Sequence, residues 1–308
     1  MLSALTNTLS PSRTLNGLPV SAVSVLTKAA AIIRMHVTDP GSVLFNIRLK
    51  YIINSRTQMD EEIIGLKDVH KAFGEKEVHT GVTLSIKKGE NITVLGGSGS
   101  GKSVLLKEIT GLLKPDSGDI LIEGDNIVSM SESELVNVRK KIGMPIQGAA
   151  LFDSLTVEEN IAYPLRENTS FPDDEIGDIV AKNLEMVGLP DIQDKMPNDL
   201  SGGMKKRVGL ARAMAMNPKI LLYDEPTTGL DPPNITRINH LIRDMQEQFG
   251  ITAVIITHDV SSAFEISDRL AFLYHGKIVF AGTVEEAKNT DVQILSDFIN
   301  AKLEGGDE

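Results

Sequence analysis

The chain has 308 residues, of which 41% are hydrophobic, and this is enough to bury the core of one large domain or two small ones. The absence of Cys excludes disulfide bonds and thiolate metal sites. No apolar stretch reaches the roughly 18 uninterrupted residues of a membrane-spanning helix, so any role at a membrane would involve a partner protein.

Charge is distributed unevenly along the chain. Residues 1–58 carry six basic side chains and one acidic one, a balance of +5, whereas the remaining 25 basic and 41 acidic residues give −16. Such an excess of acid argues against a protein that holds nucleic acid by neutralising its phosphates. We therefore expect no nucleic-acid partner.

The basic segment 1–58 is rich in Ser, Thr and Leu and shows no sustained helical or strand period. Three interpretations of it stay open: a disordered extension or start-site artefact, a targeting segment, and a segment that docks on a partner. A second Met at position 59 opens the regular pattern. We therefore predict that residues 59–308 form the folded domain.

From Met59 onward the pattern is that of an α/β protein. Runs rich in β-formers, next to Gly-containing turns, predict short strands at Ile63–Val69, Val82–Ile86 and Asp119–Glu123. Apolar residues at helical spacing predict a helix over Asp174–Val187. The middle of the chain is therefore expected to be a helical insertion.

Three further runs are continuously apolar, as strands covered on both faces are: Ile92–Leu95, Ile220–Tyr223 and Ala253–Ile256. Each run ends at a polar or Gly-rich segment. In an open parallel sheet, ligands bind beyond the carboxyl ends of the strands. We therefore expect these three strand ends to converge on one site.

The first of these runs leads into a phosphate-binding loop. The full pattern is present in the order Gly96, Gly97, Ser98, Gly99, Ser100, Gly101, Lys102 and Ser103. Its glycines let backbone N–H groups point at phosphate, and the helix that follows adds its dipole. Lys102 would place its charge at the β and γ phosphates, and the Ser103 hydroxyl would bind Mg²⁺. A Gly-rich turn without a ligand is the alternative, and the match at every position disfavours it.

The second run ends in two carboxylates, Asp224 and Glu225. Asp224 can hold Mg²⁺, and Glu225 can orient and deprotonate an attacking water molecule. Two acids after an apolar strand are about equally often a plain strand end or a helix cap. The phosphate loop earlier in the chain and Pro226, which stops the strand, favour the catalytic interpretation.

A third motif connects these features to a known family. The sequence Leu200-Ser201-Gly202-Gly203-Met204 resembles the signature of ATP-binding cassette ATPases, and it lies upstream of the acidic pair, as in that family. With Gln147, Gly229-Leu230-Asp231 and His258, the family motifs appear in family order over residues 59–308. The resemblance implies a P-loop NTPase core with an antiparallel β subdomain and a helical signature subdomain over about residues 158–215.

The resemblance also assigns roles that single residues do not reveal. It implies that Gln147 senses Mg²⁺ and links to a membrane subunit, that Asp231 lies at a dimer interface, and that His258 contacts the γ-phosphate. Phe73 is similar to the aromatic residue that stacks on adenine, and Val104 continues the nucleotide contacts of the loop. Taken alone, Gln147 reads as a surface amide, His258 as a strand-end residue and Phe73 as a packing residue. The implied ligands of Mg²⁺ are Ser103, Gln147 and Asp224.

The signature also has a physical interpretation. Ser201 can cap a helix that continues through Lys205 to Met214, leaving free N–H groups aimed at an anion. In cassette ATPases that anion is the γ-phosphate held by the other protomer. This sequence contains one phosphate loop and one signature, so two complete sites would require a homodimer.

The segment around Gln147 carries information about the transported substrate. Residues 147–157, Asn160 and residues 162–167, with residues 103–107 and 203–207, resemble the phospholipid-trafficking branch, the Mla and Mce-associated ATPases. The end of the chain shortly after Lys302 fits that branch. In the family, a groove near Gln147 and residues 149–157 receives a permease helix. We expect Leu151 and Phe152 to be exposed there, with burial in the core as the alternative.

The sequence thus predicts an ATPase that works at the cytoplasmic face of the inner membrane as a peripheral subunit. It would hydrolyse MgATP as a homodimer and drive a separate permease that moves phospholipid, together with a periplasmic Mce-type partner. One alternative is the ATPase of a polar amino-acid or peptide importer. The other is a soluble cassette protein that acts on ribosomes or DNA, although such proteins typically carry two cassettes or long coiled coils.

Overall fold

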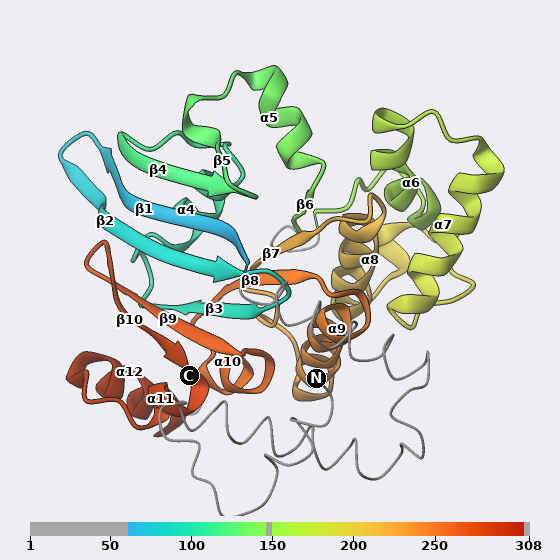
Figure 1. Ribbon diagram of the computed structural model, residues 1–308. Helices are drawn as coiled ribbons and strands as arrows, with labels where there is room; N and C mark the ends of the chain where they lie inside the picture. The colour runs from blue at the N-terminus through green and yellow to red at the C-terminus, as the bar shows by residue number, and fades with distance from the viewer. Residues whose placement is uncertain (1–60, 146–149, 305–308) are drawn as a thin grey trace, which may run out of the picture. The chain divides into compact units, whose positions relative to one another are not determined.

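Two β-sheets form the centre of the structure, a computed structural model that describes residues 61–145 and 150–304 (Figure 1). The basic segment 1–58 lies outside the described residues. The larger sheet has the strand order β10-β9-β3-β8-β7-β6. Its strands are β3 (Asn91–Leu95), β6 (Ile142–Gly143), β7 (Ile220–Asp224), β8 (Thr252–Thr257), β9 (Arg269–Tyr274) and β10 (Lys277–Thr283). All neighbours in it are parallel except β10, which pairs antiparallel with β9.

The smaller sheet is antiparallel and has the order β2-β1-β4-β5. Its strands are β1 (Glu62–Phe73), β2 (Lys76–Lys87), β4 (Ser117–Ile122) and β5 (Asp125–Asn126). β1 and β2 are longer than the sequence predicts, because the polar residues before Gly74 continue the ladder as far as the pair Phe73 and Lys76. Gly74 makes the turn with a φ of 63°. The hairpin thereby carries Phe73 to the end of its strand.

The helices complete the fold. They are α4 (Lys102–Ile109), η1 (Ile127–Ser129), α5 (Glu132–Arg139), α6 (Val157–Asn168), α7 (Asp173–Met186), η2 (Pro197–Asp199), α8 (Gly202–Met214), α9 (Pro232–Phe249), α10 (Val260–Ile266), α11 (Val284–Lys288) and α12 (Gln293–Glu304). Figure 1 shows α6, α7 and α8 side by side at the right, and each contacts the other two. The helix predicted over Asp174–Val187 is α7. Among the described helices, none combines the length and apolar character that a bilayer crossing needs.

The continuously apolar strands lie between two hydrophobic cores. In β7, Leu221 and Tyr223 pack into the core shared with α6–α9, whereas Ile220 and Leu222 pack into the core shared with α4 and the antiparallel sheet. β8 alternates in the same way. Successive side chains of a strand point to opposite faces, so a strand covered on both sides is mainly apolar, and its polar side chains, such as Thr93 of β3, need a buried hydrogen-bond partner. The prediction of strands buried on both faces is confirmed.

The carboxyl ends of β3, β7 and β8 lie at one edge of the larger sheet, as predicted. Leu95, the last residue of β3, is level with Thr257 of β8, and Asp224 of β7 is level with Ile256. The phosphate loop follows β3 directly, and the acidic pair stands at the end of β7. The parallel register therefore brings the two motifs to the same edge.

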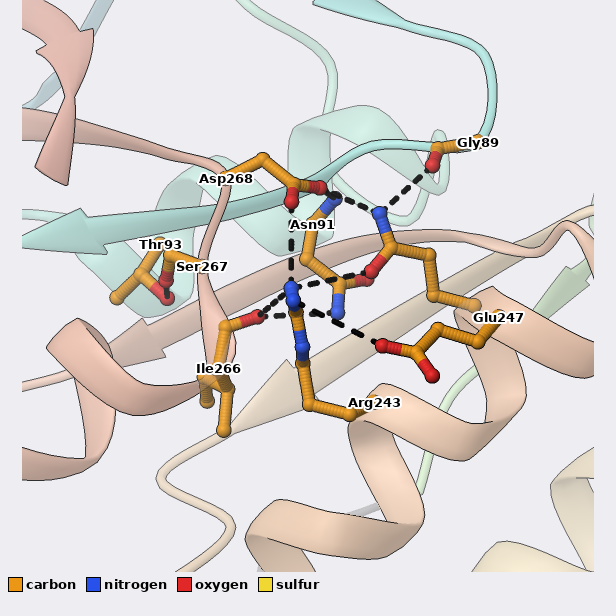
Figure 2. A network of polar contacts seen from close by, with 9 residues as sticks. Gly89, Asn91, Thr93, Arg243, Glu247, Ile266, Ser267 and Asp268 are labelled. Carbon is orange, nitrogen blue, oxygen red and sulfur yellow. Dashed lines mark hydrogen bonds and ion pairs between the residues drawn. The ribbon is translucent and has the colours of Figure 1, made fainter. Parts of the chain in front are cut away.

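A polar network secures the opposite, amino end of this sheet (Figure 2). The Asn91 backbone N–H donates to Asp268 at 2.9 Å, and the Asn91 side chain donates to the carbonyl of Ile266 at 3.1 Å. Arg243 of α9 reaches the same Asp268 at 3.2 Å. The network therefore joins β3, α9 and the connection from α10 to β9, and it fixes the base from which β3 runs towards the phosphate loop.

Candidate active site

The phosphate loop connects β3 to α4 through backbone conformations that favour glycine. Gly99 and Gly101 have φ angles of 75° and 104°. A Cβ atom on Gly96 would lie 2.7 Å from the carbonyl oxygen of Leu273. α4 begins at Lys102 with Gly101 as its N-cap, and no side chain caps it. The free N–H groups at the start of α4 and the loop amides are thus suited to an anion.

Lys102 is a buried cation at the end of this loop, with 8% of its surface exposed. Its Nζ donates to the carbonyl oxygens of Gly96 at 2.8 Å and Gly97 at 3.0 Å. Burial lowers the pKa of Lys102, while the charges of Glu225 and Asp224 act in the opposite direction. The loop thus binds this ammonium group through two carbonyl oxygens, and the negative charges of the acidic pair stabilise its protonated form.

Ser103 and Asp224 place two hard oxygen atoms next to each other. The Ser103 Oγ donates to Asp224 Oδ1 at 3.4 Å. Burial raises the pKa of Asp224, and the hydrogen bond from Ser103 partly opposes that effect. Two ligands on one Mg²⁺ octahedron lie about 3 Å apart, so these oxygens fit that ion. Gln147, the third predicted ligand, lies outside the described residues.

Glu225 is the most constrained carboxylate of the site. Its φ angle of 49° is in the left-handed region, and its N–H donates to the carbonyl of Ile256 at 2.9 Å. The Thr257 and Thr228 hydroxyls donate to its Oε2 at 3.0 Å and 3.2 Å. Its Oε1 lies 3.0 Å from Nδ1 of His258. Of the three residues predicted to be catalytic, Glu225 and His258 are therefore in direct contact, whereas Gln147 lies outside the described residues. The Nε2 atom of His258 remains for a further partner.

The phosphate loop from Gly97 onward, Glu225 and His258 line a pocket of about 840 Å³, whereas Gly96 and Asp224 do not line it. Among the predicted residues, those lining it are Phe73, Gly97, Ser98, Gly99, Ser100, Gly101, Lys102, Ser103, Val104, Glu225 and His258. Phe73 is 50% exposed, and the Lys71 ammonium lies 5.5 Å from the centre of its ring. The pocket also includes Val78 of β2 and Phe298 of α12, which the sequence analysis did not identify.

The signature residues form a second cluster. Ser201 caps α8, and its Oγ accepts the N–H of Met204 at 3.3 Å. Asp231 is the N-cap of α9 and accepts a short hydrogen bond from Asn234, whose amide also lies against Gly203. Within the described chain, none of the signature residues or Asp231 lines the pocket. One chain therefore keeps the signature cluster apart from its own pocket.

Lys206 of α8 connects the signature helix to the acidic pair. Its Nζ donates to the carbonyl oxygens of Pro226 at 2.9 Å and Thr228 at 2.6 Å. Burial lowers the pKa of Lys206, and the charge of Glu225 opposes this. Sequence reasoning missed this residue, because its partners are backbone carbonyls 20 or more positions away.

The segment predicted to meet a permease is described from residue 150 onward. Phe152 is 44% exposed, as predicted, whereas Leu151 is only partly exposed and packs against the core of α6–α9. The Phe152 ring lies 5.0 Å from that of Tyr163, which is also 44% exposed. Asn160 holds the backbone of Phe152 through both its N–H, at 2.8 Å, and its carbonyl, at 3.1 Å. An aromatic pair thus stands on a rigid support.

Comparisons with known proteins agree with this geometry. The family model described as ABC transporter matches residues 79–228. The chain is 41% identical over 242 residues to a protein named probable ribonucleotide transport ATP-binding protein mkl from Mycobacterium leprae, covering 79% of this chain and 70% of that protein. It is 46% identical over 223 residues to the methionine import ATP-binding protein MetN of Carboxydothermus hydrogenoformans, covering 72% and 66%.

A third relative carries the name intermembrane phospholipid transport system ATP-binding protein MlaF, from Haemophilus influenzae. It is 36% identical over 248 residues, which cover 80% of this chain and 94% of that protein. Among solved structures, a dimeric ATP-binding cassette in a post-hydrolysis state, bound to ADP and Pi, matches with a TM-score of 0.66 and 34% identity, covering 72% of this chain and 98% of that one. The names of the three relatives give three different transported substrates.

Proposed function

The chain belongs to the ATP-binding proteins of ABC transporters and hydrolyses ATP, and on this premise we propose that two copies of it together drive a membrane permease that moves phospholipid. The observation that carries the chemistry is the placement of Glu225. Its carboxylate lines the pocket, two hydroxyls and an imidazole fix it, and the phosphate loop lies opposite.

In this proposal the phosphate loop holds the triphosphate, and Lys102 balances the charge on its outer phosphates. Glu225 accepts a proton from the water molecule that attacks the γ-phosphoryl group, and His258 contacts that group through Nε2. Phe73 offers a half-exposed ring for stacking on the base. Ser103 and Asp224 would hold Mg²⁺, which supplies positive charge against the phosphate oxygens when it is bound.

The proposal of a homodimer is based on the separation between the signature cluster and the pocket of the same chain. Ser201 and Gly202 are exposed at the start of α8, where free N–H groups suit an anion, yet they do not line the pocket of their own chain. A second copy can bring its α8 to this pocket, and Asp231 would then lie at the interface. The dimeric state of the related cassette with ADP and Pi supports this arrangement.

Phospholipid as the substrate is supported by the alignment with MlaF, which extends over 94% of that protein. The resemblance of residues 147–157, Asn160 and residues 162–167, with residues 103–107 and 203–207, to the phospholipid-trafficking branch supports it as well. The partners in this proposal are a permease and a periplasmic Mce-type protein, and the ATPase binds the permease at the cytoplasmic face of the inner membrane. Phe152 and Tyr163 form the apolar contact for the permease.

The experiment is purification of the complex from membranes, identification of bound lipid by mass spectrometry, and transport assays in proteoliposomes. Movement of methionine or a nucleotide without lipid would overturn the substrate, given the relatives named for those substrates. A Phe152→Asp variant tests the contact, because the exposed ring predicts a folded subunit with weakened assembly. Phe171→Asp is the matched control, since Phe171 is 43% exposed in the connection between α6 and α7.

A further inference from the structure

A buried His–Glu pair lies directly beneath the phosphate loop. His79 comes from β2 and Glu108 from α4, and the side chains of both are 0% exposed. The Nδ1 atom of His79 lies 2.8 Å from Oε2 of Glu108, and its Nε2 atom lies 3.2 Å from the carbonyl oxygen of Gly101. Neither side chain lines the nucleotide pocket, and the proposed chemistry does not use them.

The two contacts together indicate that Nε2 of His79 carries a hydrogen atom. Each contact needs one hydrogen atom, because a carboxylate oxygen and a carbonyl oxygen both accept, and a neutral imidazole has a single N–H. Two protons satisfy both contacts, either as an imidazolium with a carboxylate or as an Nε2–H imidazole with a carboxylic acid. In both distributions the Nε2 atom of His79 carries a proton and donates to Gly101.

Only glycine at position 101 allows this approach. A Cβ atom there would lie 2.8 Å from Nε2 of His79 and 2.8 Å from a methyl group of Val78. The φ angle of Gly101 is 104°, which other residues rarely adopt. The imidazole therefore packs directly against the backbone at the point where the loop becomes a helix.

The contact also fixes the direction of an N–H group that faces the phosphates. The carbonyl oxygen of Gly101 accepts from His79 and from the N–H of Leu105, the latter at 3.0 Å, so both of its lone pairs are engaged. In a planar trans peptide the C=O and the next N–H point in opposite directions. With the carbonyl held towards His79 and α4, the N–H of Lys102 is directed out of the helix start, towards the pocket.

We propose that His79 is a positioning residue for nucleotide binding, which holds the Gly101–Lys102 peptide so that the Lys102 amide meets the triphosphate. Glu108 orients the imidazole from below. The inference rests on the proposed role of the loop as the triphosphate site. A purely structural pair would stabilise the fold and leave nucleotide affinity unchanged.

The first test compares two variants by calorimetric titration with a non-hydrolysable MgATP analogue. In Glu108→Leu, a neutral imidazole can still donate from Nε2 to Gly101, so we expect an affinity close to that of wild type. The double variant His79→Leu, Glu108→Leu removes the contact without leaving a lone buried charge. Its affinity should fall about two- to twelvefold, the range for one hydrogen bond. Equal affinity of the folded single and double variants would overturn the positioning role.

The second test is NMR of the ¹⁵N-labelled imidazoles of the full wild-type chain at neutral pH, with the His79 signals assigned by their loss in His79→Gln. We expect a protonated Nε2, and a bare Nε2 with the proton on Nδ1 would overturn the inference even if the double variant fails to fold. Failure of the wild type to bind the analogue would overturn the proposed function of the loop, and this inference with it. Normal wild-type binding with equal variant affinities would overturn this inference alone.

Discussion

Replacement of Glu225 by Gln tests the central chemical claim with little change of shape. In the structure, the Thr228 and Thr257 hydroxyls donate to one carboxylate oxygen, and a Gln carbonyl oxygen can accept both bonds. The amide nitrogen would then face Nδ1 of His258, which can accept once its proton resides on Nε2. We therefore expect the variant to fold normally and to bind MgATP within about threefold of wild type, since an amide retains these contacts.

Hydrolysis should respond differently from binding, because an amide cannot take the proton of the attacking water. Loss of a general base costs about 10²- to 10⁴-fold in rate, which corresponds to about 2.7–5.5 kcal/mol on the barrier. Phosphate release at saturating MgATP gives the turnover number, and calorimetric titration gives the affinity. Glu247→Gln is the control, since its carboxylate is 64% exposed on α9. Turnover of Glu225→Gln within threefold of wild type would refute the assignment.

Three further predictions concern the rest of the site and its support. Lys206→Met should lower turnover roughly tenfold with little change in MgATP affinity. The substitution removes the hydrogen bonds that join α8 to the turn after Glu225. Lys205→Met is the control for the lost charge. Phe73→Ala should weaken ATP binding by about 1–3 kcal/mol, measured by titration, and leave the thermal midpoint unchanged because the ring is half exposed. Asp268→Ala should lower the free energy of unfolding by about 1–3 kcal/mol in denaturant melts, because the Asn91 N–H loses its acceptor. Its MgATP affinity should not change, since this network stands at the other end of β3.

The parts of the site whose residues are contiguous in the chain could be predicted from the sequence. The phosphate loop is one contiguous segment, and the strands before Gly96 and Glu225 are mainly apolar because both of their faces are covered. Reasoning from pattern was less accurate where strands are partly exposed. β1 continues to Phe73 through the polar His70 and Lys71, whose ladder partners on β2 no local pattern reveals.

Contacts between segments that are distant in the chain could not be predicted from the sequence, for a physical reason. Lys206 and His79 both meet backbone carbonyls, and a carbonyl has no residue-specific signal in the sequence. Phe298 reaches the nucleotide pocket from the last described helix, and packing against Phe272 sets its position, with ring centres 5.1 Å apart. Such residues resemble ordinary surface lysines and core aromatics until the fold is known.

A continuous series of contacts leads from the proposed permease surface to Glu225, the proposed catalytic carboxylate. Asn160 holds Phe152, and Arg212 of α8 donates to the carbonyl of Ala150 at 3.0 Å, so hydrogen bonds join the segment before α6 to α8. At the other end of α8, Lys206 holds the turn at 226–228, from which Thr228 donates to Glu225.

A helix transmits displacement along its axis because its backbone hydrogen bonds resist stretching. A shift imposed on Phe152 would therefore reach Glu225 through Arg212, α8 and Lys206, without passing through the phosphate loop. On this route the permease would alter turnover more than nucleotide affinity, since the proposed triphosphate site is the loop between β3 and α4 with the start of α4, and this series of contacts does not include it. These contacts form a physical path between the two sites. Whether the sites are coupled along it depends on the interaction free energy between its residues, which double-mutant cycles measure. Removal of Lys206 should accordingly abolish much of the effect that Phe152→Asp has on turnover in the assembled transporter.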